Sequence, residues 1–509
     1  MARWVDEIPA RWARDRGGET ALACARSRHT WRELEKARTE WSARLAGLGV
    51  RPGDRVMVVG ENCPAMVLLV FALATLRAWV VNVNARLSAR EVDAIRAHCG
   101  ARRVVFLVED SRDAAEHARR LSAEPLEGGA WGAMALSSLD DAAPETVTGD
   151  PAQDVAALLY TTGTTGEPKA VMLTHASLLF IARNSGELRR ITPEDRIYGL
   201  LPLTHVYGLA SVTLGSLLAG GSLHLQARFV PAAAAEFIRG ERLTVCQGVP
   251  AMYAKLVHHL KEHGISSFDA PHLRFLYAGG SPLVPALKRE AEEFFGLRLH
   301  NGYGLTEASP TVTQTRQEAP RDDCSVGPAI PGVTLRIVDR DARDLPDGEV
   351  GELWVQGPNV MKGYYRDPGA TAGVIHPGGW LATGDLARRD PDGAIHIVGR
   401  LKELIIRSGF NVFPVEVESV LNAHSAVSQS AVVGRSVDGD EEVVAFVELA
   451  PGAGATPAEL MEFAARSLAP YKRPSEIVVL PALPAAPSGK VLKGQLARMA
   501  RELRSTPAR

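Results

Sequence analysis

The sequence predicts an α/β protein with a large N-terminal domain of α/β layered sheets, a small β-rich subdomain and a small α+β C-terminal domain. Three observations support this fold class. Helical and strand patterns alternate to about residue 310, which is typical of parallel sheets covered on both faces. Short strands and turns then replace helices over 325–398. At 509 residues the chain also exceeds what one hydrophobic core usually supports.

The composition is that of an ordinary soluble enzyme. Hydrophobic residues make up 46% and charged residues 23%, and the net charge is −2. This balance gives no global field that would attract nucleic acid or an anionic membrane. The five cysteines are scattered without CxxC spacing, so we expect reduced thiols in a cytoplasmic protein rather than disulfides or a zinc site.

No targeting or membrane segment is expected. The first fifteen residues carry charges of both signs without an apolar core, unlike a signal peptide. The most apolar segment, Ala65–Leu76, is too short to span a bilayer. The sequence therefore predicts a soluble protein without a membrane span.

The first 150 residues are expected to alternate between helices and strands. Thr30 and Glu33 form a capping box that should open a helix, which Gly47 and Gly49 end. We expect strands at Arg55–Val59, Trp79–Val83 and Arg103–Val108, and helices at Pro64–Leu76 and Ser88–His98. Residues 126–152 are rich in Gly, Ala, Pro and Asp, and are predicted to be a surface loop.

A loop of hydroxyls and glycines follows between two strand-like runs, Val155–Tyr160 and Ala170–Leu173. Its glycines allow backbone N–H groups to converge on an anion, and its threonines and Lys169 add donors and a positive charge. The pattern predicts a polyphosphate cradle, the alternative being a Thr/Gly-rich surface hairpin. It is not the usual P-loop, because Pro168 precedes the lysine and a strand follows it.

Three polar or glycine-rich loops are expected at strand ends farther along the chain. They lie at Leu200–Gly208, Ala278–Pro282 and His300–Glu307. Open α/β sheets bind ligands at such strand ends.

The last unit begins at Gly399 and is long enough for a separate domain, with about 110 residues. Predicted strands lie at Leu404–Ile406, Ser430–Val433 and Val443–Leu449. One predicted helix covers Pro414–Ala423, and another begins after the Thr456 cap.

The stretch from Leu159 to Met172 closely resembles the phosphate loop of the adenylate-forming enzymes, which include acyl-CoA synthetases, luciferases and peptide-synthetase adenylation domains. Further motifs of this family occur in the family's order from Thr30 to Lys493. The resemblance implies an adenylation core at 1–399, a hinge at 400–402 centred on Lys402, and a mobile C-terminal domain at 403–509.

The resemblance also implies roles in binding ATP. Tyr303 would stack on adenine, Asp385 would accept the ribose hydroxyls, Arg400 would contact ribose and phosphate, and Glu307 with Thr162 would hold Mg²⁺. Outside this context Glu307 would be a solvated charge, Tyr303 a packed turn residue and Asp385 an Asx-turn. The implied ATP contacts are Thr161, Thr162, Gly163, Thr164, Thr165, Gly166, Lys169, Gly279, Gly280, Ser281, Asn301, Gly302, Tyr303, Gly304, Thr306, Asp385, Ile397 and Arg400.

Lys490 follows Pro487-Ser488-Gly489 and resembles the family's C-terminal catalytic lysine. A carboxylate attacking a phosphate brings two anions together, and a lysine at the α-phosphate with Mg²⁺ on the leaving diphosphate offsets that repulsion. Glu307, His205 and Thr306 are the other catalytic candidates. Without the preceding motif Lys490 would be a solvated terminal lysine, and His205 could equally be a packed residue.

The carboxylic acid is the least defined ligand. Its expected pocket consists of His205, Tyr207, Gln247, Gly248, Ala278, Gly279, Gly302 and Gly304. Gly302 places no charge beside the pocket, whereas malonyl-type enzymes carry an arginine there. A neutral, mostly apolar pocket favours a medium- or long-chain fatty acid or an aromatic monocarboxylic acid.

Ser408, Gly409 and Phe410 are expected to line the CoA channel, with Ser408 in place of the first glycine of the family's frequent Gly-Gly pair. Because the chain runs only 19 residues past Lys490, we expect no fused carrier domain. The resemblance therefore implies an AMP-forming acyl-CoA synthetase that uses ATP, Mg²⁺ and CoA, as a monomer or homodimer. A stand-alone adenylation enzyme for a separate carrier protein and a silent nucleotide-binding protein are the alternatives.

Overall fold

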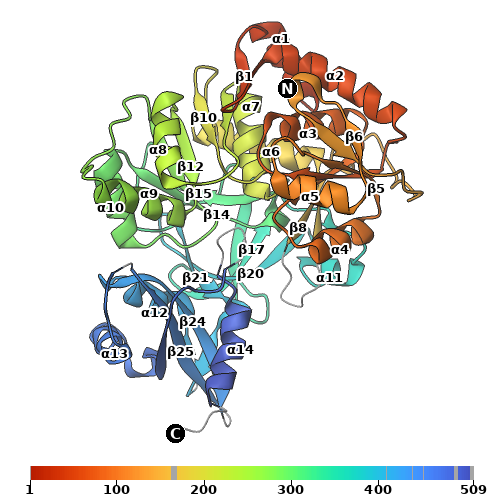
Figure 1. The fold of residues 1–509 in the computed structure, drawn as a ribbon. Coiled ribbons are helices and arrows are strands. Elements are labelled where there is room, and N and C mark those ends of the chain that lie inside the picture. The colour runs from red at the N-terminus through yellow and green to blue at the C-terminus, as the bar shows by residue number, and fades with distance from the viewer. Residues whose placement is uncertain are drawn as a thin grey trace.

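A computed structural model describes residues 2–161, 169–408, 410–437, 440–450, 452–485 and 491–504. Within these residues the chain forms two eight-stranded sheets, a five-stranded sheet and two smaller sheets. Figure 1 shows the N-terminal elements above and the C-terminal elements, drawn in blue, below. The expected α/β class, with a large N-terminal and a small C-terminal domain, is confirmed. Residues 162–168, Gly409 and Lys490 lie outside the described residues.

The first large sheet has a parallel centre and antiparallel edges, in the order β18-β9-β8-β4-β3-β5-β7-β6. Its parallel strands are β3 (Arg55–Gly60), β4 (Trp79–Asn84), β5 (Ala101–Phe106) and β8 (Val155–Thr161). Its edges are β6 (Glu124–Leu126), β7 (Met134–Leu136), β9 (Lys169–Thr174) and β18 (Gly363–Tyr364).

The second large sheet follows the order β15-β14-β13-β12-β10-β11-β1-β2. Its parallel strands are β1 (Thr20–Ala23), β10 (Arg196–Gly199), β11 (Ser222–Leu225), β12 (Val245–Gly248), β13 (Phe275–Ala278) and β14 (Leu299–Gly304). The antiparallel strands β2 (Arg28–Thr30) and β15 (Thr311–Gln314) close its two edges.

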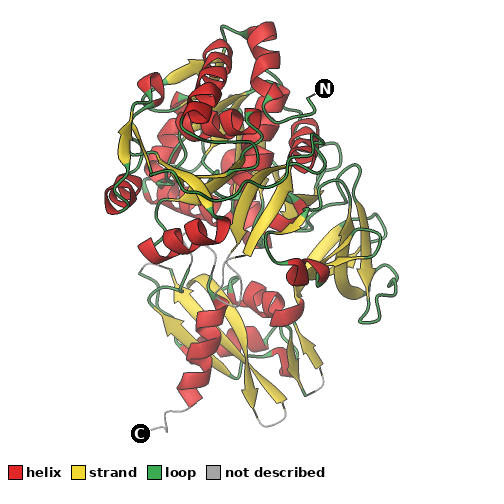
Figure 2. Ribbon diagram, turned by 90° about the vertical axis from the view of Figure 1, so that its right-hand side faces the viewer, coloured by secondary structure: helices red, strands yellow, loops and turns green. Residues whose placement is uncertain are grey.

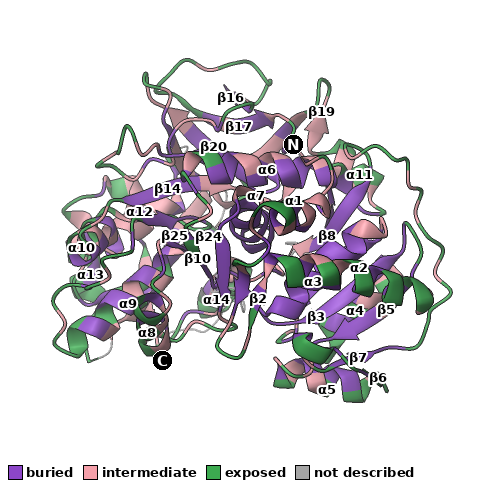
Figure 3. Cartoon of the chain, turned by 90° about the horizontal axis from the view of Figure 1, so that it is seen from above, coloured by how far each residue is buried: buried purple, intermediate pink, exposed green. Residues whose placement is uncertain are grey.

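A buried layer of helices joins the two large sheets. Along β3, Val56 and Val58 belong to the core shared by both sheets, whereas Met57 and Val59 belong to a second core on the opposite face, as the period-2 alternation of a strand requires. The shared layer contains α2 (Trp31–Gly47), α3 (Pro64–Thr75), α6 (His175–Leu188) and the π-helical segment η2 (Tyr207–Leu214), flanked by α1 (Glu7–Arg16) and α7 (Gly215–Ala219). Figure 3 shows buried residues in the interior and exposed ones on outer helices and loops.

Helices on the outer faces complete the layers. The first sheet is covered by α4 (Ala89–Cys99) and α5 (Arg112–Arg120), and the second by α8 (Pro231–Gly240), α9 (Pro250–Glu262) and α10 (Pro285–Phe295). The capping box predicted at Thr30 is confirmed, and a second one at Ser88 begins α4. In both, the cap hydroxyl accepts from the N3 backbone while the N3 glutamate accepts from the cap N–H, satisfying two otherwise orphaned donors.

The β-rich subdomain predicted over 325–398 is confirmed as a five-stranded antiparallel sheet. It contains β16 (Thr334–Val338), β17 (Val350–Gln356), β19 (Ile375–His376), β20 (Trp380–Arg389) and β21 (Ile395–Arg400), with α11 (Pro368–Ala372) beside it.

The C-terminal unit has its own sheets and its own cores (Figure 2). The strands are β22 (Ile405–Arg407), β23 (Phe410–Val412), β24 (Val427–Val437), β25 (Asp440–Leu449) and β26 (Glu476–Leu480). The helices are α12 (Pro414–Leu421), α13 (Pro457–Ala465) and α14 (Lys493–Arg504). Thr456 caps α13 as predicted.

Two local predictions were wrong. Residues 126–152 are not only a surface loop, because Met134–Leu136 form the buried strand β7 beside β5. Residues 300–304 do not leave the sheet, because β14 continues to Gly304 and pairs with β15. In both cases a neighbouring strand supplies hydrogen-bond partners that override the local glycine content. Among the described residues, none of the helices has the length and apolar character needed to cross a membrane.

Candidate active site

The hairpin of β8 and β9 holds the two ends of the phosphate-loop segment together. Thr161 pairs with Lys169 across the hairpin, and the Thr161 hydroxyl donates to the Lys169 carbonyl over 3.4 Å. Beyond β9, the strand β18 places Tyr364 opposite Val171. The Lys169 ammonium nitrogen lies 5.1 Å from the centroid of the Tyr364 ring, within cation–π range. The hairpin therefore presents Lys169 beside an aromatic ring at the edge of the sheet.

Tyr364 also connects Lys169 to the predicted metal ligand. Its hydroxyl donates a 2.7 Å hydrogen bond to Glu307 Oε1. Glu307 lies in the short 3₁₀ turn η3 (Thr306–Ala308), whose backbone is fixed by the Met361 N–H donating to the Glu307 carbonyl over 2.8 Å. Burial and the Glu307 charge raise the pKa of Tyr364, so the phenol remains a donor. An oriented carboxylate beside a phosphate loop fits Mg²⁺, which is commonly held by one or two carboxylates together with substrate phosphates.

Tyr303, Asp385 and Arg400 form a second contiguous group. The Tyr303 hydroxyl donates to Asp385 Oδ2 over 2.5 Å, and Arg400 Nε lies 3.1 Å from Asp385 Oδ1. Asp385 is 5% exposed. Asp385 and Arg400 are directly opposite in the β20–β21 pair, which explains why residues fifteen positions apart meet. The structure thus brings together the predicted adenine, ribose and phosphate contacts.

The backbone before Asp385 is shaped for this placement. Gly384 has a φ of +70°, in the left-handed region that favours glycine. The Thr383 hydroxyl accepts from the Asp385 N–H over 3.1 Å and donates to the Leu353 carbonyl over 2.7 Å. The carboxylate therefore projects from a fixed turn.

Lys402 lies in the 3₁₀ turn η4 (Leu401–Glu403), directly after β21. Desolvation and then the Arg400 charge lower the pKa of its ammonium, and Lys169 adds to the repulsion. Glu403 and Asp385 oppose this effect. Lys169 of the β8–β9 hairpin, Arg400 of β21 and Lys402 of the following turn are therefore close enough for their charges to repel one another. Such a cluster of positive charge is expected at a site that binds a polyanion.

The remaining predicted nucleotide contacts lie in or directly after β13 and β14, except Ile397, which lies in β21. Gly279 is buried, and its N–H donates to the Gly248 carbonyl over 3.1 Å, whereas Gly280 and Ser281 are exposed. The Asn301 side-chain amide donates to the Cys324 and Ser325 carbonyls over 3.2 Å each. The Asn301 amide is thus committed to holding the neighbouring loop. Ile397 is partly buried in β21.

Tyr207, Gln247, Gly279 and Gly302 of the predicted acid pocket lie beside Tyr277, which the sequence did not single out. A Cβ on Gly302 would lie 1.9 Å from the Tyr277 hydroxyl, so only glycine fits there. Tyr207 packs edge-to-face on Tyr277 with ring centroids 6.1 Å apart. His205 is exposed just before η2, and its Nδ1 accepts from the Tyr207 N–H over 3.2 Å. Gln247, Gly248, Ala278, Gly279 and Gly302 are buried, and Gly304 is partly buried.

Arg189 is a second residue that the sequence did not single out. It follows α6, is fully buried, and its Nη1 donates to Gln247 Oε1 over 2.6 Å. Its guanidinium carbon lies 4.6 Å from the centroid of the Tyr277 ring. A buried cation therefore hydrogen-bonds directly to Gln247, one of the residues predicted for the acid pocket.

On the C-terminal side the predicted lysine lies outside the described residues, but its surroundings are defined. Ala485 and Val491 pair across the segment that carries Lys490. The Lys493 Nζ atom lies 3.0 Å from Glu403 Oε2 and 2.8 Å from Glu418 Oε1. Ser408 has a φ of +50°, and its N–H and hydroxyl donate to the two Asp440 oxygens over 2.6 and 3.0 Å. Phe410 is 54% exposed and stacks on Tyr471, with ring centroids 4.6 Å apart.

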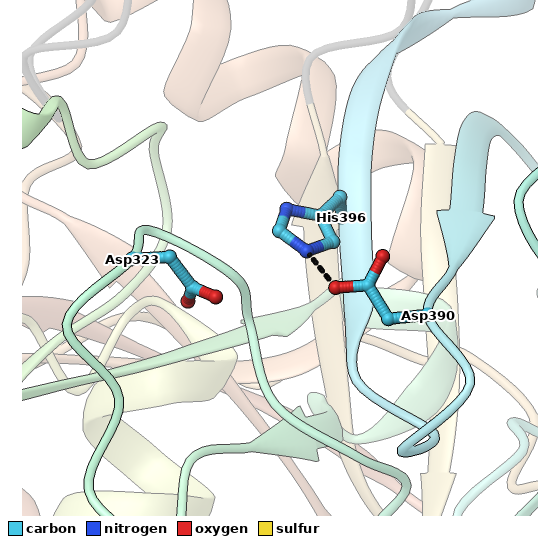
Figure 4. Close-up of side chains that lie close together, drawn as sticks. All are labelled: Asp323, Asp390 and His396. Atoms are coloured by element: carbon cyan, nitrogen blue, oxygen red, sulfur yellow. Dashed lines mark hydrogen bonds and ion pairs between the residues drawn. The ribbon is translucent and has the colours of Figure 1, made fainter.

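Asp323, Asp390 and His396 lie close enough to share a metal ion (Figure 4). His396 Nε2 and Asp390 Oδ2 are 2.7 Å apart. Arg321 Nη2 lies 2.7 Å from Asp323 and 3.6 Å from Asp390, and its Nη1 bonds Asp392. Because this arginine already supplies the positive charge, we interpret the cluster as an ion-pair network that fixes the loop before β21.

Comparisons with known proteins agree with this geometry. The model of the AMP-binding enzyme family matches residues 9–365, and that of the AMP-binding enzyme C-terminal domain matches residues 416–490. Feruloyl-CoA synthase from Amycolatopsis sp is 36% identical over 493 residues, covering 96% of this chain and 98% of that protein.

Two solved structures have the same fold over nearly the whole chain. ATP-bound MatB from Rhodopseudomonas palustris has a TM-score of 0.86 and 30% identity, with 98% and 99% of the two chains covered. O-succinylbenzoate coenzyme A synthetase (MenE) from Bacillus subtilis, in complex with ATP and magnesium ion, has a TM-score of 0.81 and 29% identity, with 96% and 99% covered.

Proposed function

Since this chain belongs to the AMP-binding enzyme family, we propose that it is an AMP-forming acid–CoA ligase. The acid carboxylate attacks the α-phosphorus of ATP, the bond to the β-phosphate breaks, and diphosphate leaves. The CoA thiol then gives up its proton and attacks the acyl carbonyl, and AMP leaves. The observation that carries this proposal is a pair of contact groups, Lys169 with Tyr364 and Glu307, and Tyr303 with Asp385 and Arg400, joined by the short segment from Tyr303 to Glu307.

The residue roles follow from this arrangement. The hairpin loop and Lys169 receive the β- and γ-phosphates, Glu307 with Thr162 takes the Mg²⁺ that accompanies ATP, and Asp385 accepts the ribose hydroxyls. Lys490 neutralises charge at the α-phosphate during adenylation. Mg²⁺ supplies charge compensation on the leaving diphosphate. His205, exposed at the start of η2, borders the carboxylate end of the acid.

The substrate we propose is a medium- or long-chain fatty acid or an aromatic monocarboxylic acid. Gly302 and Gly279 let the rings of Tyr277 and Tyr207 pack close to the ends of β13 and β14, and this aromatic wall suits an apolar or aromatic acid. The similarity to feruloyl-CoA synthase supports the aromatic class.

Residues 1–399 act as the adenylation core, 400–402 as the hinge and 403–509 as the mobile domain that carries Lys490. Ser408, Gly409 and Phe410 would then line the pantetheine channel after the domain has rotated; the exposure of Phe410 supports this. We place the enzyme in the cytoplasm, where ATP and CoA are available and where its five free thiols would stay reduced. It would work as a monomer or homodimer.

The test is acid-dependent exchange of diphosphate into ATP, followed by CoA-dependent release of AMP with no added protein. Both activities are expected. Exchange without CoA-dependent AMP release would instead indicate an adenylation enzyme that serves a separate carrier protein. Absence of exchange with every acid in a fatty and aromatic panel would refute acyl-adenylate formation.

A further inference from the structure

Arg189 is a buried cation without a carboxylate partner among the residues that the structure describes. It is 0% exposed, and its Nη1 donates to Gln247 Oε1 over 2.6 Å and to the Ser211 carbonyl over 3.1 Å. Its Nε and Nη2 are fully buried and donate to no described group. Leaving buried charged donors unsatisfied is costly, so this arrangement needs an explanation beyond packing.

The unsatisfied donors lie on one edge of the guanidinium. Nη1 is occupied by protein acceptors, whereas Nε and Nη2 form the planar fork that binds two oxygen atoms side by side. The hydrogen bond that Nη1 donates to Gln247 Oε1 fixes the orientation of this fork. Nε2 of Gln247 is itself a buried donor that no described residue accepts from.

The neighbouring tyrosines belong to the same group. The Arg189 guanidinium lies over the Tyr277 ring, whose hydroxyl end lies against Gly302 in the predicted acid pocket. Burial raises the pKa of both Tyr207 and Tyr277, and the Arg189 charge opposes that rise in both. The buried Tyr207 hydroxyl also has no hydrogen-bond partner in the part of the chain that the structure describes. Four donor groups, from the residue that follows α6 and from η2 and β12, therefore lie beside the predicted pocket without acceptors among the described residues.

We propose that Arg189 is a specificity-determining residue that binds two adjacent oxygen atoms at the end of the acid distant from the reacting carboxylate. This inference rests on the proposed function, because it assigns the class of acid that the same site takes. A carboxylate or a vicinal pair of ring oxygens supplies the required acceptors; a hydrocarbon end leaves the fork unsatisfied. The pocket thus selects an oxygen-terminated acid over a hydrocarbon of the same shape.

The test compares isosteric acids on the full-length enzyme by diphosphate exchange. One pair is 3,4-dihydroxycinnamate and 3,4-dimethylcinnamate, and the other is 4-carboxycinnamate and 4-isopropylcinnamate, so that the pairs distinguish ring oxygens from a carboxylate. Wild type should prefer the oxygen-bearing member of at least one pair by tenfold or more in kcat/KM. Arg189→Met should reduce that ratio to below threefold, because kcat/KM should fall more for the oxygen-bearing acid than for its hydrocarbon counterpart.

Two further variants keep the result interpretable. Arg190→Met removes the adjacent arginine, whose side chain is 63% exposed and ion-paired with Glu318, and should leave the ratio unchanged. Arg189→Lys retains the positive charge but lacks the two parallel N–H donors. The logarithm of its kcat/KM ratio between the two acids of a pair should be less than half of the wild-type value. If Arg189→Met does not fold, this lysine variant carries the test.

The inference and the proposed function can fail separately. Equal use of both members of each pair by wild type, or an unchanged ratio in Arg189→Met, would overturn the role of Arg189 while leaving acid activation intact. No exchange with any of the four acids or with the wider fatty and aromatic panel would instead refute the proposed function.

Discussion

The hydroxyl of Tyr303 donates a hydrogen bond to Asp385 Oδ2 over 2.5 Å, although the two residues lie 82 positions apart. The opposite oxygen of the same carboxylate lies 3.1 Å from Arg400 Nε. Ribose hydroxyls would need these same carboxylate oxygens as acceptors. If Asp385 binds ribose as proposed, the Tyr303 hydroxyl would compete with the sugar, whereas the Tyr303 ring is the part that adenine would use.

We accordingly expect opposite outcomes for two variants of this pair. Asp385→Asn should raise the KM for ATP by roughly ten- to hundredfold, the equivalent of losing about 1.5–3 kcal/mol of hydrogen bonding to a charged group. Tyr303→Phe should keep the KM within about threefold of wild type, since the ring remains and a competitor is removed. Steady-state diphosphate exchange at varied ATP measures both. A larger effect from Tyr303→Phe than from Asp385→Asn would contradict the assignment.

The second prediction concerns Glu307 and Tyr364. The Tyr364 hydroxyl orients the Glu307 carboxylate through a 2.7 Å hydrogen bond to Oε1. Glu307→Gln should leave the fold intact and reduce adenylation by on the order of a hundredfold, as expected for losing a transition-state electrostatic contact. Tyr364→Phe should cost about 1 kcal/mol, roughly fivefold, mainly as a higher Mg²⁺ requirement. The measurement is diphosphate exchange across a Mg²⁺ titration.

Tyr365→Phe is the matched control for that titration. Its hydroxyl donates instead to Glu145, over 2.5 Å, so it removes a similar bond without touching Glu307. Near-normal activity of Glu307→Gln at limiting Mg²⁺ would show that Glu307 is not the metal ligand.

The third prediction concerns the length of the acid. Octanoate or cinnamate should exceed acetate and malonate in kcat/KM by more than tenfold, because each buried CH₂ contributes about 0.8 kcal/mol. The assay is AMP formation across a panel of acids. Acetate or malonate as the best substrate would contradict the proposed pocket around Tyr277.

The fold could be predicted where its determinants are local in sequence. Thr30 and Glu33, or Thr456 and Glu459, lie within one turn of each other, so a capping box can be recognised before any tertiary contact is known. The strand β7 was missed because its three residues gain their partners only from β5. Long-range pairing of this kind leaves no periodic signal in so short a segment.

The candidate site likewise divides into residues that a local motif reveals and residues whose partners lie far away in the sequence. Loop motifs with several special residues were enough to predict Lys169, Glu307 and Asp385 as candidates. Tyr364 and Arg189 were missed because their partners lie 57 and 58 positions away, at Glu307 and Gln247. In the sequence Arg189 is one of two adjacent arginines at a helix end, where basic residues are common. Only the structure distinguishes the buried Arg189 from its exposed neighbour Arg190.

Buried histidines give the fourth prediction, which concerns stability. His175 is 0% exposed, its Nδ1 accepts from the Val5 N–H over 3.4 Å, and burial lowers its pKa to about 3. The neutral form is therefore favoured in the folded state. This contribution is complete above the unfolded pKa of about 6.5 and is lost as the pH falls toward 3. At pH 5 the loss should be about 2 kcal/mol.

The corresponding measurement is Tm, or the free energy of unfolding, between pH 7.5 and 5. His175→Gln should flatten the pH dependence, because it removes the titrating group. His258→Gln, at an exposed helix position, should retain the wild-type slope. An unchanged slope in His175→Gln would show that His175 does not contribute to acid sensitivity.

The last prediction separates the two half-reactions. Lys490, which lies outside the described residues, should act only on the α-phosphate, so Lys490→Ala should reduce adenylate formation by about a hundredfold or more and still convert supplied acyl-adenylate and CoA to thioester. Lys402 lies in a 3₁₀ turn, whose φ suits proline, so Lys402→Pro should preserve adenylation and slow thioester formation by restricting the hinge. Lys402→Ala controls for loss of the ammonium. Single-turnover assays of both steps measure these effects, and equal loss of both steps in either Lys490→Ala or Lys402→Pro would refute this division of roles.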